Sequence, residues 1–369
     1  MCGRFSLGIN INDLPLVFND TVQEGANQAL AESATDLKEV SKDRYKAYDS
    51  DGQLGYELFL SDIAAFKSSY NIAPTNDALI IYAKNSDSTD KLVYIVETLK
   101  FGLVPMWAKP KDSLPVRRGG KPGPKYSKEI QKYESMYFNC RKETLAQKKA
   151  IWNSCKNNRC VIPIQGYFEW LKKDNKKIPY FISDSKQPLV YLAGFYSHNT
   201  NYKDVVEDSR GYISSFTVVT GPADKKDSKD LSWLHNRKPL LVAPASKEWF
   251  DWLNPKAKWS ETLLSTTLDT INNEAYLHIQ SFKVSKDVGN PTTEGAYLIR
   301  EDKGSQKSIE LFLQSSKKSP KRKTEEDYSP NKRVKNESHS IPTEKTETEI
   351  KKDIKEENEQ KIKMEPSGD

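Results

Sequence analysis

Short apolar runs of strand length dominate the chain up to about residue 300 and limit the folds that it can adopt. Runs such as KLVYIVETLKFGLVP, PLVYLAGFYS and SSFTVVTGP are rich in β-branched and aromatic residues, with Gly, Pro and Asn between them. Helical patterns are fewer: one covers residues 142–157, and another follows Ser246, a suitable N-cap. Because strands outnumber helices and do not alternate with them regularly, the sequence predicts an α+β domain around an antiparallel, barrel-like sheet with flanking helices.

The distribution of aromatic residues indicates where the core ends. Tyr328 is the only aromatic residue after Phe312, and residues 315–369 are dense in Lys, Glu, Ser and Pro. Such a segment cannot bury enough apolar surface to offset the entropy lost on ordering. We therefore expect one domain over residues 2–314 and a disordered tail over residues 315–369.

Two segments of the domain differ in composition from the rest. Residues 20 to 55, approximately, are polar and indicate an insertion near the N-terminus. Residues 109–132 contain four Pro, three Gly and eight basic residues, which predicts a flexible basic loop.

Charge and cysteine usage restrict the protein class. The formal net charge is +6 at pH 7, which is compatible with a polyanionic partner. No apolar run approaches the roughly 18 residues of a membrane helix, and the N-terminus lacks a signal peptide. We expect a soluble, intracellular monomer without membrane contact. Cys155 and Cys160 lack a second pair nearby, so we predict no metal site and no cofactor.

Cys2 occupies an unusual place for a cysteine, because chain ends are normally frayed and exposed. After removal of Met1, this residue presents an α-amine and a thiol on adjacent carbons. The reference pKa of the amine is about 8, so a useful fraction is neutral and nucleophilic. A 1,2-aminothiol can attack an acyl group through sulfur, or condense with an aldehyde through nitrogen and close a thiazolidine ring.

Glu169 and His235 are the best candidates for proton transfer. Glu169 stands among aromatic residues in GYFEWLK, and His235 lies in WLHNRKPLLV. A carboxyl in apolar surroundings can act as a general acid, and a His at a strand end can face a cleft. Each has an ordinary alternative: the Glu can point outward from its strand, and the His can be a satisfied structural residue.

Nine sequence blocks, taken in order, resemble the SRAP family, the SOS-response-associated peptidases, also described as abasic-site processing or DNA-protein crosslinking proteins. The resemblance extends from residue 2 to about residue 300. The blocks are MCGRF (1–5), YNIAPT (70–75), FGLVPMWA (101–108), FNCRKET (138–144), RCVIPIQGYFEW (159–170), AGFY (193–196), TVVTGPAD (217–224), LHNRKPLLV (234–242) and FKVSKDVGN (282–290).

The resemblance implies a sensor and processor of abasic sites in single-stranded DNA. In this family the aldehyde of an abasic site reacts with the N-terminal cysteine to give a thiazolidine crosslink, which assigns that role to Cys2. Asn139 is similar to the asparagine that positions the sugar. Glu169 corresponds to the acid/base of imine formation, and His235 to a proton shuttle near the phosphate.

The same resemblance predicts the DNA-binding residues. Arg4 and Arg141 would hold phosphates, a task that suits a planar bidentate donor. Trp107 and Pro74 would form a wedge beside the unstacked gap, although a tryptophan at a strand end is often part of the core. Cys140 stands where the family commonly has a small residue, and we expect it to be a bystander.

Two alternatives to crosslinking remain. One is a thiol autopeptidase that uses an N-terminal nucleophile, and the other is a non-catalytic reader of modified or damaged DNA. Since Cys2 follows Met1 directly, only one residue precedes it here, which favours abasic-site crosslinking with lyase-type chemistry.

The C-terminal region suggests partners. The segment QKSIELFL resembles a sliding-clamp-binding motif, or is a last amphipathic helix of the domain; its anchor positions are Gln306, Ile309 and Phe312. The sumoylation consensus occurs around Lys335, Lys355 and Lys363. The basic clusters KKSPKRK and NKRVK predict a nuclear, eukaryotic, fungal-type member of the family, with the cytoplasm as a second location.

Overall fold

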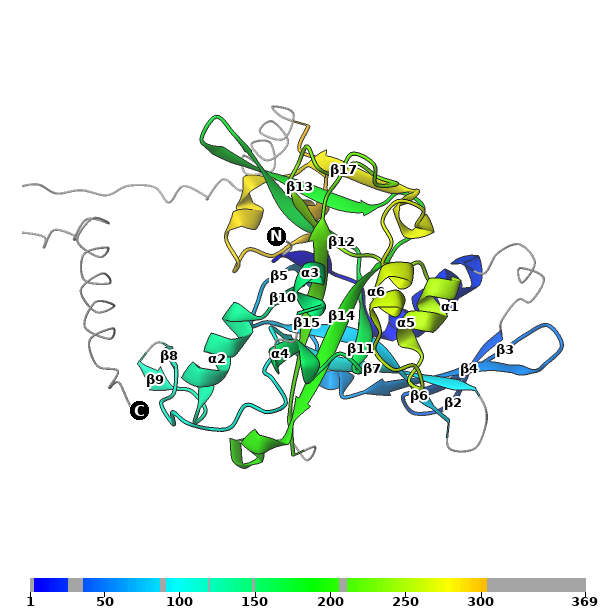
Figure 1. Cartoon of the computed structure of the whole chain (residues 1–369), viewed down its shortest axis with the longest axis horizontal. Helices are drawn as coiled ribbons and strands as arrows, with labels where there is room; N and C mark the ends of the chain where they lie inside the picture. The colour runs from blue at the N-terminus through cyan, green and yellow to red at the C-terminus, as the bar shows by residue number, and fades with distance from the viewer. Residues whose placement is uncertain are drawn as a thin grey trace, which may run out of the picture. The chain divides into compact units, whose positions relative to one another are not determined.

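The computed structural model describes residues 3–25, 36–86, 91–118, 120–147, 150–205 and 211–303. They belong to the first of the two units into which the chain divides, residues 1–305 (Figure 1). Several predicted features lie outside the described residues: Cys2, the clamp-binding positions Gln306, Ile309 and Phe312, the sumoylation positions Lys335, Lys355 and Lys363, and the tail 315–369.

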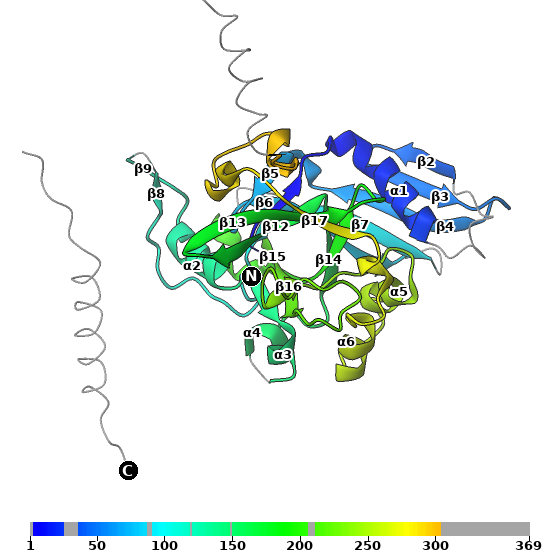
Figure 2. The same ribbon diagram turned by 90° about the horizontal axis from the view of Figure 1, so that it is seen from above.

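Five strands of the largest sheet form a closed ring, as Figure 2 shows. Neighbouring strands run antiparallel from β7 to β15, and a parallel pairing of β15 with β7 at Ser215 and Lys100 closes the ring. The α+β class is therefore confirmed, with a ring-shaped sheet. In order, these strands are β7 (Leu92–Phe101), β6 (Asp77–Asn85), β11 (Arg159–Ile164), β14 (Val190–Asn199) and β15 (Ile213–Pro222).

Other strands extend the sheet on both sides of the ring. β4 (Leu54–Ser61) pairs with β7 in parallel, followed by β3 (Arg44–Tyr48) and β2 (Asp36–Ser41). Helix α1 (Leu14–Gly25) packs against β4, where the Tyr56 hydroxyl donates to Asn19 over 2.7 Å. On the other side, β15 pairs with β10 (Asn139–Arg141) and β16 (Arg237–Pro239).

A second sheet places the start of the chain in its interior. Its order is β17, β13, β12, β1, β5, so β1 has a neighbour on either side. The Phe5 ring lies 5.1 Å from that of Phe101 in β7, which packs this sheet against the ring. The bounds are β17 (Ile279–Lys283), β13 (Lys176–Asp184), β12 (Gly166–Lys173), β1 (Phe5–Leu7) and β5 (Ser69–Ile72).

The helices are short and lie outside the sheets. Ser246 caps α5 (Lys247–Leu253) as predicted, because its hydroxyl accepts the Trp249 N–H over 3.1 Å. The predicted helix 142–157 contains α3 (Lys142–Leu145) and α4 (Ala150–Asn153). Within residues 109–132 the structure has the small hairpin β8 (Arg117–Arg118) and β9 (Lys121–Pro122) and the start of α2 (Ser127–Met136).

The remaining helical elements of the described ranges connect the strands. They are α6 (Glu261–Thr267) and the 3-10 turns η1 (Ile11–Asp13), η2 (Ile63–Ala65), η3 (Thr200–Val205), η4 (Glu274–Tyr276), η5 (Lys286–Gly289) and η6 (Ala296–Ile299).

Candidate active site

Glu169 lies on the inner face of β12. Side chains alternate along a strand, so Glu169 shares a face with Tyr167 of the main core, whereas Phe168 and Trp170 pack on the opposite face. Glu169 is 5% exposed, and its Oε1 accepts the Trp170 N–H over 3.3 Å. The sequence left the direction of this carboxyl open, and the structure places it inside.

Strand β1 brings the start of the chain to Glu169. The Phe168 N–H donates to the Arg4 carbonyl over 2.9 Å, and the register of β1 with β12, continued by one residue, sets Gly3 opposite Glu169. Cys2, outside the described residues, is joined to Gly3 by a peptide bond, which fixes their Cα separation at about 3.8 Å. The described chain thus begins at Gly3, opposite the buried Glu169.

Arg4 is anchored by protein contacts. Its Nη1 donates to Asn71 Oδ1 and to the Val288 carbonyl, both over 2.8 Å, and its Cζ lies 6.0 Å from the Trp170 ring. Burial lowers the pKa of the Arg4 guanidinium, and its Nε is buried without a hydrogen-bond partner among the described residues. A phosphate would therefore have to use the nitrogens other than Nη1.

Asn71 is a structural residue that the sequence reasoning did not single out, although it belongs to the block YNIAPT. It is fully buried, and its Nδ2 donates to the carbonyls of Asn290 and Thr293, each over 2.9 Å. Together with Arg4, it ties the segment after β17 to β1 and β5. This explains why the last block of the family resemblance, at 282–290, belongs to the site.

Asn139 presents an amide with no partner. It pairs with Val218 at the start of β10, and both its Oδ1 and its Nδ2 are buried without a hydrogen bond in the part of the chain that the structure describes. Leaving such a group unsatisfied costs about 1–3 kcal/mol, so an unpaired amide of this kind requires an explanation. Binding of a polar ligand is such an explanation.

The two neighbours of Asn139 on β10 differ strongly in their surroundings. Arg141 is exposed. Cys140 is fully buried, and burial raises the pKa of its thiol well above the usual range. A thiol in that state is a poor nucleophile, which agrees with the expectation that Cys140 is a bystander.

His235 is half-buried at the end of the loop that precedes β16. Its Nδ1 accepts the Arg237 N–H over 3.0 Å, so in the neutral ring the proton is assigned to Nε2. Two residues earlier, the Trp233 ring meets the Tyr180 ring edge-on, 5.2 Å between centroids. Tyr180 lies directly opposite Glu169 across β12 and β13, so this contact brings the His235 loop beside the carboxyl.

Arg237 fastens the His235 side of the site to the Asn139 side. Its guanidinium makes two bonds to the Glu143 carboxylate, of 2.9 and 3.1 Å, and donates to the Thr220 carbonyl over 2.9 Å. The bond from Arg237 holds the pKa of Glu143 below its usual value. Thr220 pairs with Arg141, so β16, β15 and α3 form one rigid support.

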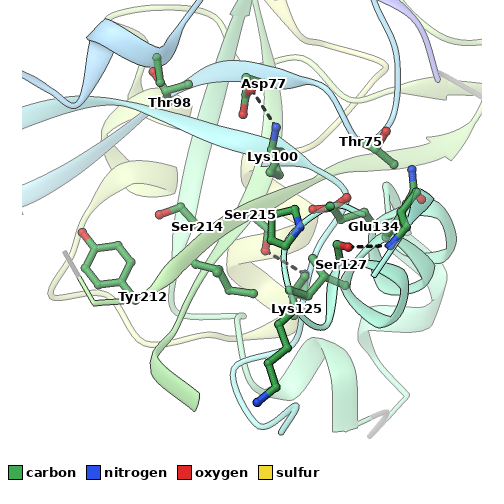
Figure 3. A pocket seen from close by; sticks show the side chains of 18 of the residues that line it. Thr75, Asp77, Thr98, Lys100, Lys125, Ser127, Glu134, Tyr212, Ser214 and Ser215 are labelled. Atoms are coloured by element: carbon green, nitrogen blue, oxygen red, sulfur yellow. Dashed lines mark hydrogen bonds and ion pairs between the residues drawn. The ribbon is translucent and has the colours of Figure 1, made fainter. Parts of the chain in front are cut away.

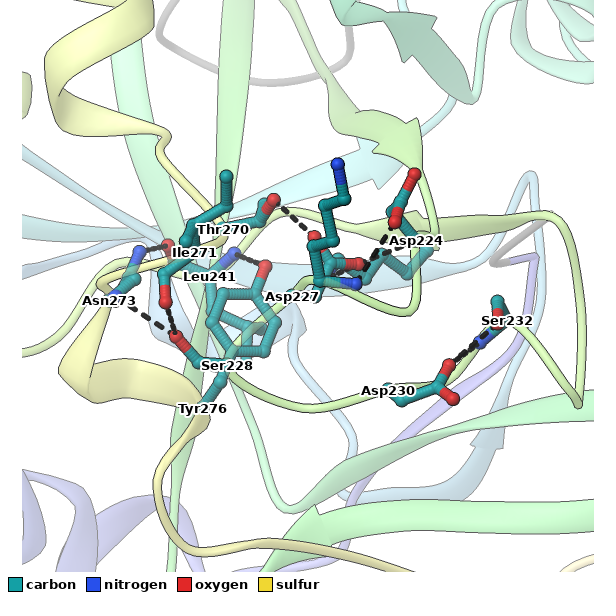
Figure 4. Close-up of polar contacts among 12 residues, drawn as sticks. Asp224, Asp227, Ser228, Asp230, Ser232, Leu241, Thr270, Ile271, Asn273 and Tyr276 are labelled. Carbon is teal, nitrogen blue, oxygen red and sulfur yellow. Dashed lines mark hydrogen bonds and ion pairs between the residues drawn. The ribbon is translucent and has the colours of Figure 1, made fainter.

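A buried ion pair stabilises the same loop, and Figure 4 shows the hydrogen bond from Thr270 to its carboxylate, Asp227. Lys238 Nζ lies 2.7 Å from Asp227 Oδ2 and 4.3 Å from the centre of the Tyr276 ring, and burial lowers the pKa of this lysine. The Thr270 hydroxyl donates to Asp227 Oδ1 over 2.6 Å. No sequence signal identified this pair, because Asp227 and Lys238 look like surface residues in the sequence.

The two predicted wedge residues lie on separate loops. Pro74 is half-buried in the turn between β5 and β6. Trp107 is 49% exposed, so it is not a core residue. Asn199, at the end of β14, holds the loop of Trp107: its Nδ2 donates to the carbonyls of Pro105 and Ala108 over 2.6 and 2.9 Å.

An aromatic cluster connects these elements. The Phe101 ring lies 5.1 Å from Phe5 of β1 and 5.9 Å from Phe138, which precedes Asn139. β1, which pairs with the strand of Glu169, and the residue that precedes β10, the strand of Asn139, thus both pack on the Phe101 side chain. Chemically, the arrangement offers a buried carboxyl, a histidine, an amide without a partner among the described residues, and the cations Arg4 and Arg141.

Two kinds of feature are absent from the described ranges. Among those residues there is no group of three or more His, Cys, Asp or Glu side chains that could hold a metal ion. No helix there is long and apolar enough to cross a membrane.

Comparison with protein families gives one match. The model of the family SOS response associated peptidase (SRAP) matches residues 1–291.

Curated relatives share a name. The abasic site processing protein YMR114C of Saccharomyces cerevisiae is 29% identical over 302 residues, which cover 81% of this chain and 68% of the yeast protein. The abasic site processing protein YoaM of Bacillus subtilis is 28% identical over 238 residues, 63% of this chain and 85% of that protein. The abasic site processing protein HMCES of Xenopus tropicalis is 24% identical over 317 residues, 77% of this chain and 79% of that protein.

Among solved structures, a crystal structure of a Bacteroides thetaiotaomicron protein has a similar fold. Its TM-score is 0.51 at 16% identity, and the match covers 82% of this chain and all of that protein.

Proposed function

Because this chain belongs to the SOS response associated peptidase (SRAP) family, we propose that it processes abasic sites in single-stranded DNA by forming a covalent thiazolidine crosslink through Cys2. Abasic-site processing is the function named for its yeast, Bacillus and Xenopus relatives. The crosslinking chemistry is our own inference from the residues around the N-terminus.

The position of β1 carries the proposal. A chain end that merely had to be buried would not require a buried carboxyl, a histidine and an unpaired amide around it. Here the register sets Gly3 opposite Glu169, and both polar atoms of the Asn139 amide are buried without a partner among the described residues. An aminothiol at residue 2 would add the nucleophile that such a site needs.

The reaction balances without an oxidant or reductant. The α-amine of Cys2 attacks the aldehyde carbon of the ring-opened sugar, and the adduct loses water to give an imine. The Cys2 sulfur then attacks the same carbon, the imine nitrogen takes up a proton, and the five-membered ring closes. Aldehyde and aminothiol thus combine with the loss of one water.

Glu169 and His235 handle the protons in this scheme. Glu169, 5% exposed on β12, protonates the departing hydroxyl and afterwards accepts the thiol proton. His235 has its Nδ1 occupied by the Arg237 N–H, so we assign its proton transfer to Nε2. Asn139 binds the sugar hydroxyls, which satisfies its buried amide at the moment of binding.

The DNA strand would be held by groups around this centre. The exposed Arg141 and the unpaired Nε of Arg4 suit phosphates, and Trp107 and Pro74 suit the gap in the base stack. Trp233 is 46% exposed and its edge contact with Tyr180 leaves a ring face for a base.

A denaturing gel tests the proposal. The purified protein, with its N-terminus checked by mass spectrometry, is mixed with single-stranded DNA that carries one abasic site, and a slow-migrating covalent species is expected. DNA with a tetrahydrofuran in place of the aldehyde should give no such species. Absence of the species with the aldehyde substrate would refute the proposal.

Variants assign the roles. Cys2→Ala should abolish the crosslink and keep DNA binding. If the wild type also forms no crosslink, and both proteins bind DNA equally well, the protein is instead a non-catalytic reader. Glu169→Gln and His235→Ala should slow crosslink formation. Glu39→Gln on β2 and His278→Ala are matched controls at exposed positions, and the roles fail if the controls slow the reaction equally.

We also propose a nuclear location, because KKSPKRK and NKRVK are basic clusters of the kind that import receptors bind. A fluorescent fusion in a eukaryotic cell, compared with one in which both clusters are changed to Ala, measures this. Equal distribution of the two fusions would contradict it.

A further inference from the structure

A cavity of about 620 Å³ lies apart from the residues that surround the N-terminus. It opens between β6, β7, the start of β15, and the segment 116–134 that includes α2 (Figure 3). Neither Asn139, Glu169 nor His235 lines it. Its size falls within the range of small-molecule sites, and it has no place in the crosslinking scheme.

Two polar side chains that line this cavity, Glu134 and Thr98, are buried. Glu134, on α2, is 6% exposed and lines the cavity. Burial raises the pKa of Glu134 to about 7, with Lys100 lowering it and Asp77 raising it. The Thr98 hydroxyl, on β7, is also buried without a partner among the described residues. Two buried oxygens therefore face a space that could supply hydrogen-bond donors.

Glu134 is held firmly in place. The end of α2 packs on Gly102, whose φ is +128° and whose missing Cβ would lie 2.2 Å from the Glu134 carbonyl oxygen. Only glycine tolerates that backbone and that contact. Leu103 N–H then donates to the Tyr137 carbonyl over 3.1 Å. The carboxyl is thus presented by a rigid element.

The lining residues Val116 and Ser127 and the nearby Lys111 and Asp112 are also held by specific bonds. The Glu129 carboxylate accepts the N–H groups of Lys111 and Asp112 over 3.0 and 2.9 Å. The Ser127 hydroxyl accepts the Val116 N–H over 2.8 Å. The cavity is therefore preformed, which lowers the entropy lost when a ligand binds.

The lining suits a ligand with three parts. Lys121 and Lys125 are exposed where they line the opening, whereas Lys100 is engaged with Asp77 at 2.8 Å. The cations at the opening, of which Lys125 lies 4.8 Å from the centre of the Tyr126 ring, favour an anionic group, and the inner carboxyl favours a hydrogen-bond donor. The space between them is mostly apolar and suits a flat ring; it is lined by Val104, Val116, Pro122, Pro124, Ile130 and Ile213.

We propose that this cavity binds a nucleotide whose base carries an exocyclic amino group, with the amino group donating to Glu134 and the phosphate at Lys121 and Lys125. Adenine, cytosine and guanine each have such a donor. Thymine lacks it: a carbonyl oxygen stands in place of the amino group, and its one donor, the ring N3–H, lies between two carbonyl oxygens. The site goes beyond the proposed crosslinking and stands without it, because its residues are separate from that centre.

The nucleotide can be free or part of a DNA strand, and two measurements separate these sources. Titration calorimetry of the full chain with dAMP, dCMP, dGMP and dTMP tests free nucleotides. Fluorescence anisotropy with undamaged oligo-dA, oligo-dC and oligo-dT tests bases within a strand. Whether the ligand is a free nucleotide or a base within a strand, we expect the thymine form to bind about ten-fold or more weakly than the others. This factor corresponds to the loss of one hydrogen bond to a charged group.

Variants connect the preference to the cavity. Glu134→Gln keeps the volume and should remove most of the preference over thymine, whereas Glu39→Gln, at an exposed position on β2 outside the cavity lining, should keep it. Val116→Phe should block binding by filling the space. The idea is overturned if neither nucleotides nor strands distinguish thymine, or if Glu134→Gln and Val116→Phe bind like the wild type.

Crosslinking to abasic DNA, measured in parallel, keeps the two proposals apart. Glu134→Gln should crosslink at the wild-type rate, which also verifies that the variant is folded. If the wild type binds nucleotides but never crosslinks, the proposed function fails and the cavity stands. If the wild type crosslinks but shows no base preference, the cavity proposal fails and the proposed function stands.

Discussion

Replacing Glu134 by Gln should stabilise the protein at neutral pH and not at acid pH. The carboxyl is 6% exposed and its pKa is raised from 4.5 to about 7, mainly by burial. Between these two pH values the folded protein binds more protons than the unfolded chain, so stability falls as the pH rises. One pKa unit is worth about 1.4 kcal/mol, so the ionised carboxyl costs about 3 kcal/mol above pH 7.

Urea unfolding at pH 4.5, 6 and 8 measures this difference. Subtracting the wild-type free energy of unfolding from that of Glu134→Gln cancels the other titrating groups, and the difference should rise by about 3 kcal/mol from pH 4.5 to 8. A difference that stays constant over this range would mean that the carboxyl is not buried in the folded protein, and it would remove the polar end of the cavity.

Glu129→Gln supplies a control of opposite sign. Burial raises the pKa of Glu129, but the N–H groups of Asp112 and Lys111 and the Tyr202 hydroxyl outweigh it and lower the pKa overall. A carboxyl with a lowered pKa stabilises above its unfolded value and loses that contribution as the pH falls. Glu129→Gln should therefore destabilise at neutral pH and approach the wild type in acid.

Three other changes test the support of the site. Asn139→Leu removes two buried polar atoms that lack partners, so it should abolish the crosslink while the urea midpoint does not fall; a lower midpoint would indicate a structural amide. Asp227→Asn leaves the buried Lys238 charge uncompensated and should cost about 3–5 kcal/mol in urea unfolding, and adding Lys238→Met should restore part of it; no rescue would contradict the pairing. Trp233→Ala should weaken binding of undamaged single-stranded DNA by about ten-fold, as expected for loss of one stacked base, and unchanged anisotropy would exclude stacking there.

Features that depend on a few neighbouring residues were predictable from the sequence. Ser246 caps α5 because its hydroxyl needs only the Trp249 N–H three residues later. Strand lengths followed from local composition, and so did the α+β class. The predicted site residues also came from motifs, since Asn139, Glu169 and His235 each stand in a block whose order could be read directly.

Pairings between distant strands were not predictable from local pattern. The antiparallel sheet that the sequence indicates also contains parallel pairings, of β4 with β7, β10 with β15, and β15 with β7. The last one closes the ring. An apolar run indicates that a strand is buried, but it does not indicate which strand lies beside it. The closure of the ring by β15 and β7 therefore becomes visible only in the folded chain.

The sequence by itself determined the strand-rich class and the cap of α5, and it predicted the residues of the candidate site, because each rests on interactions or motifs within a few positions. Only the tertiary structure decided that Asp227 and Lys238 form a buried pair, that the Asn139 amide has no partner among the described residues, and that Glu134 faces a cavity. Burial of a polar group depends on what packs over it from elsewhere in the chain. A carboxyl on an amphipathic helix therefore looks like a surface residue until the fold covers it.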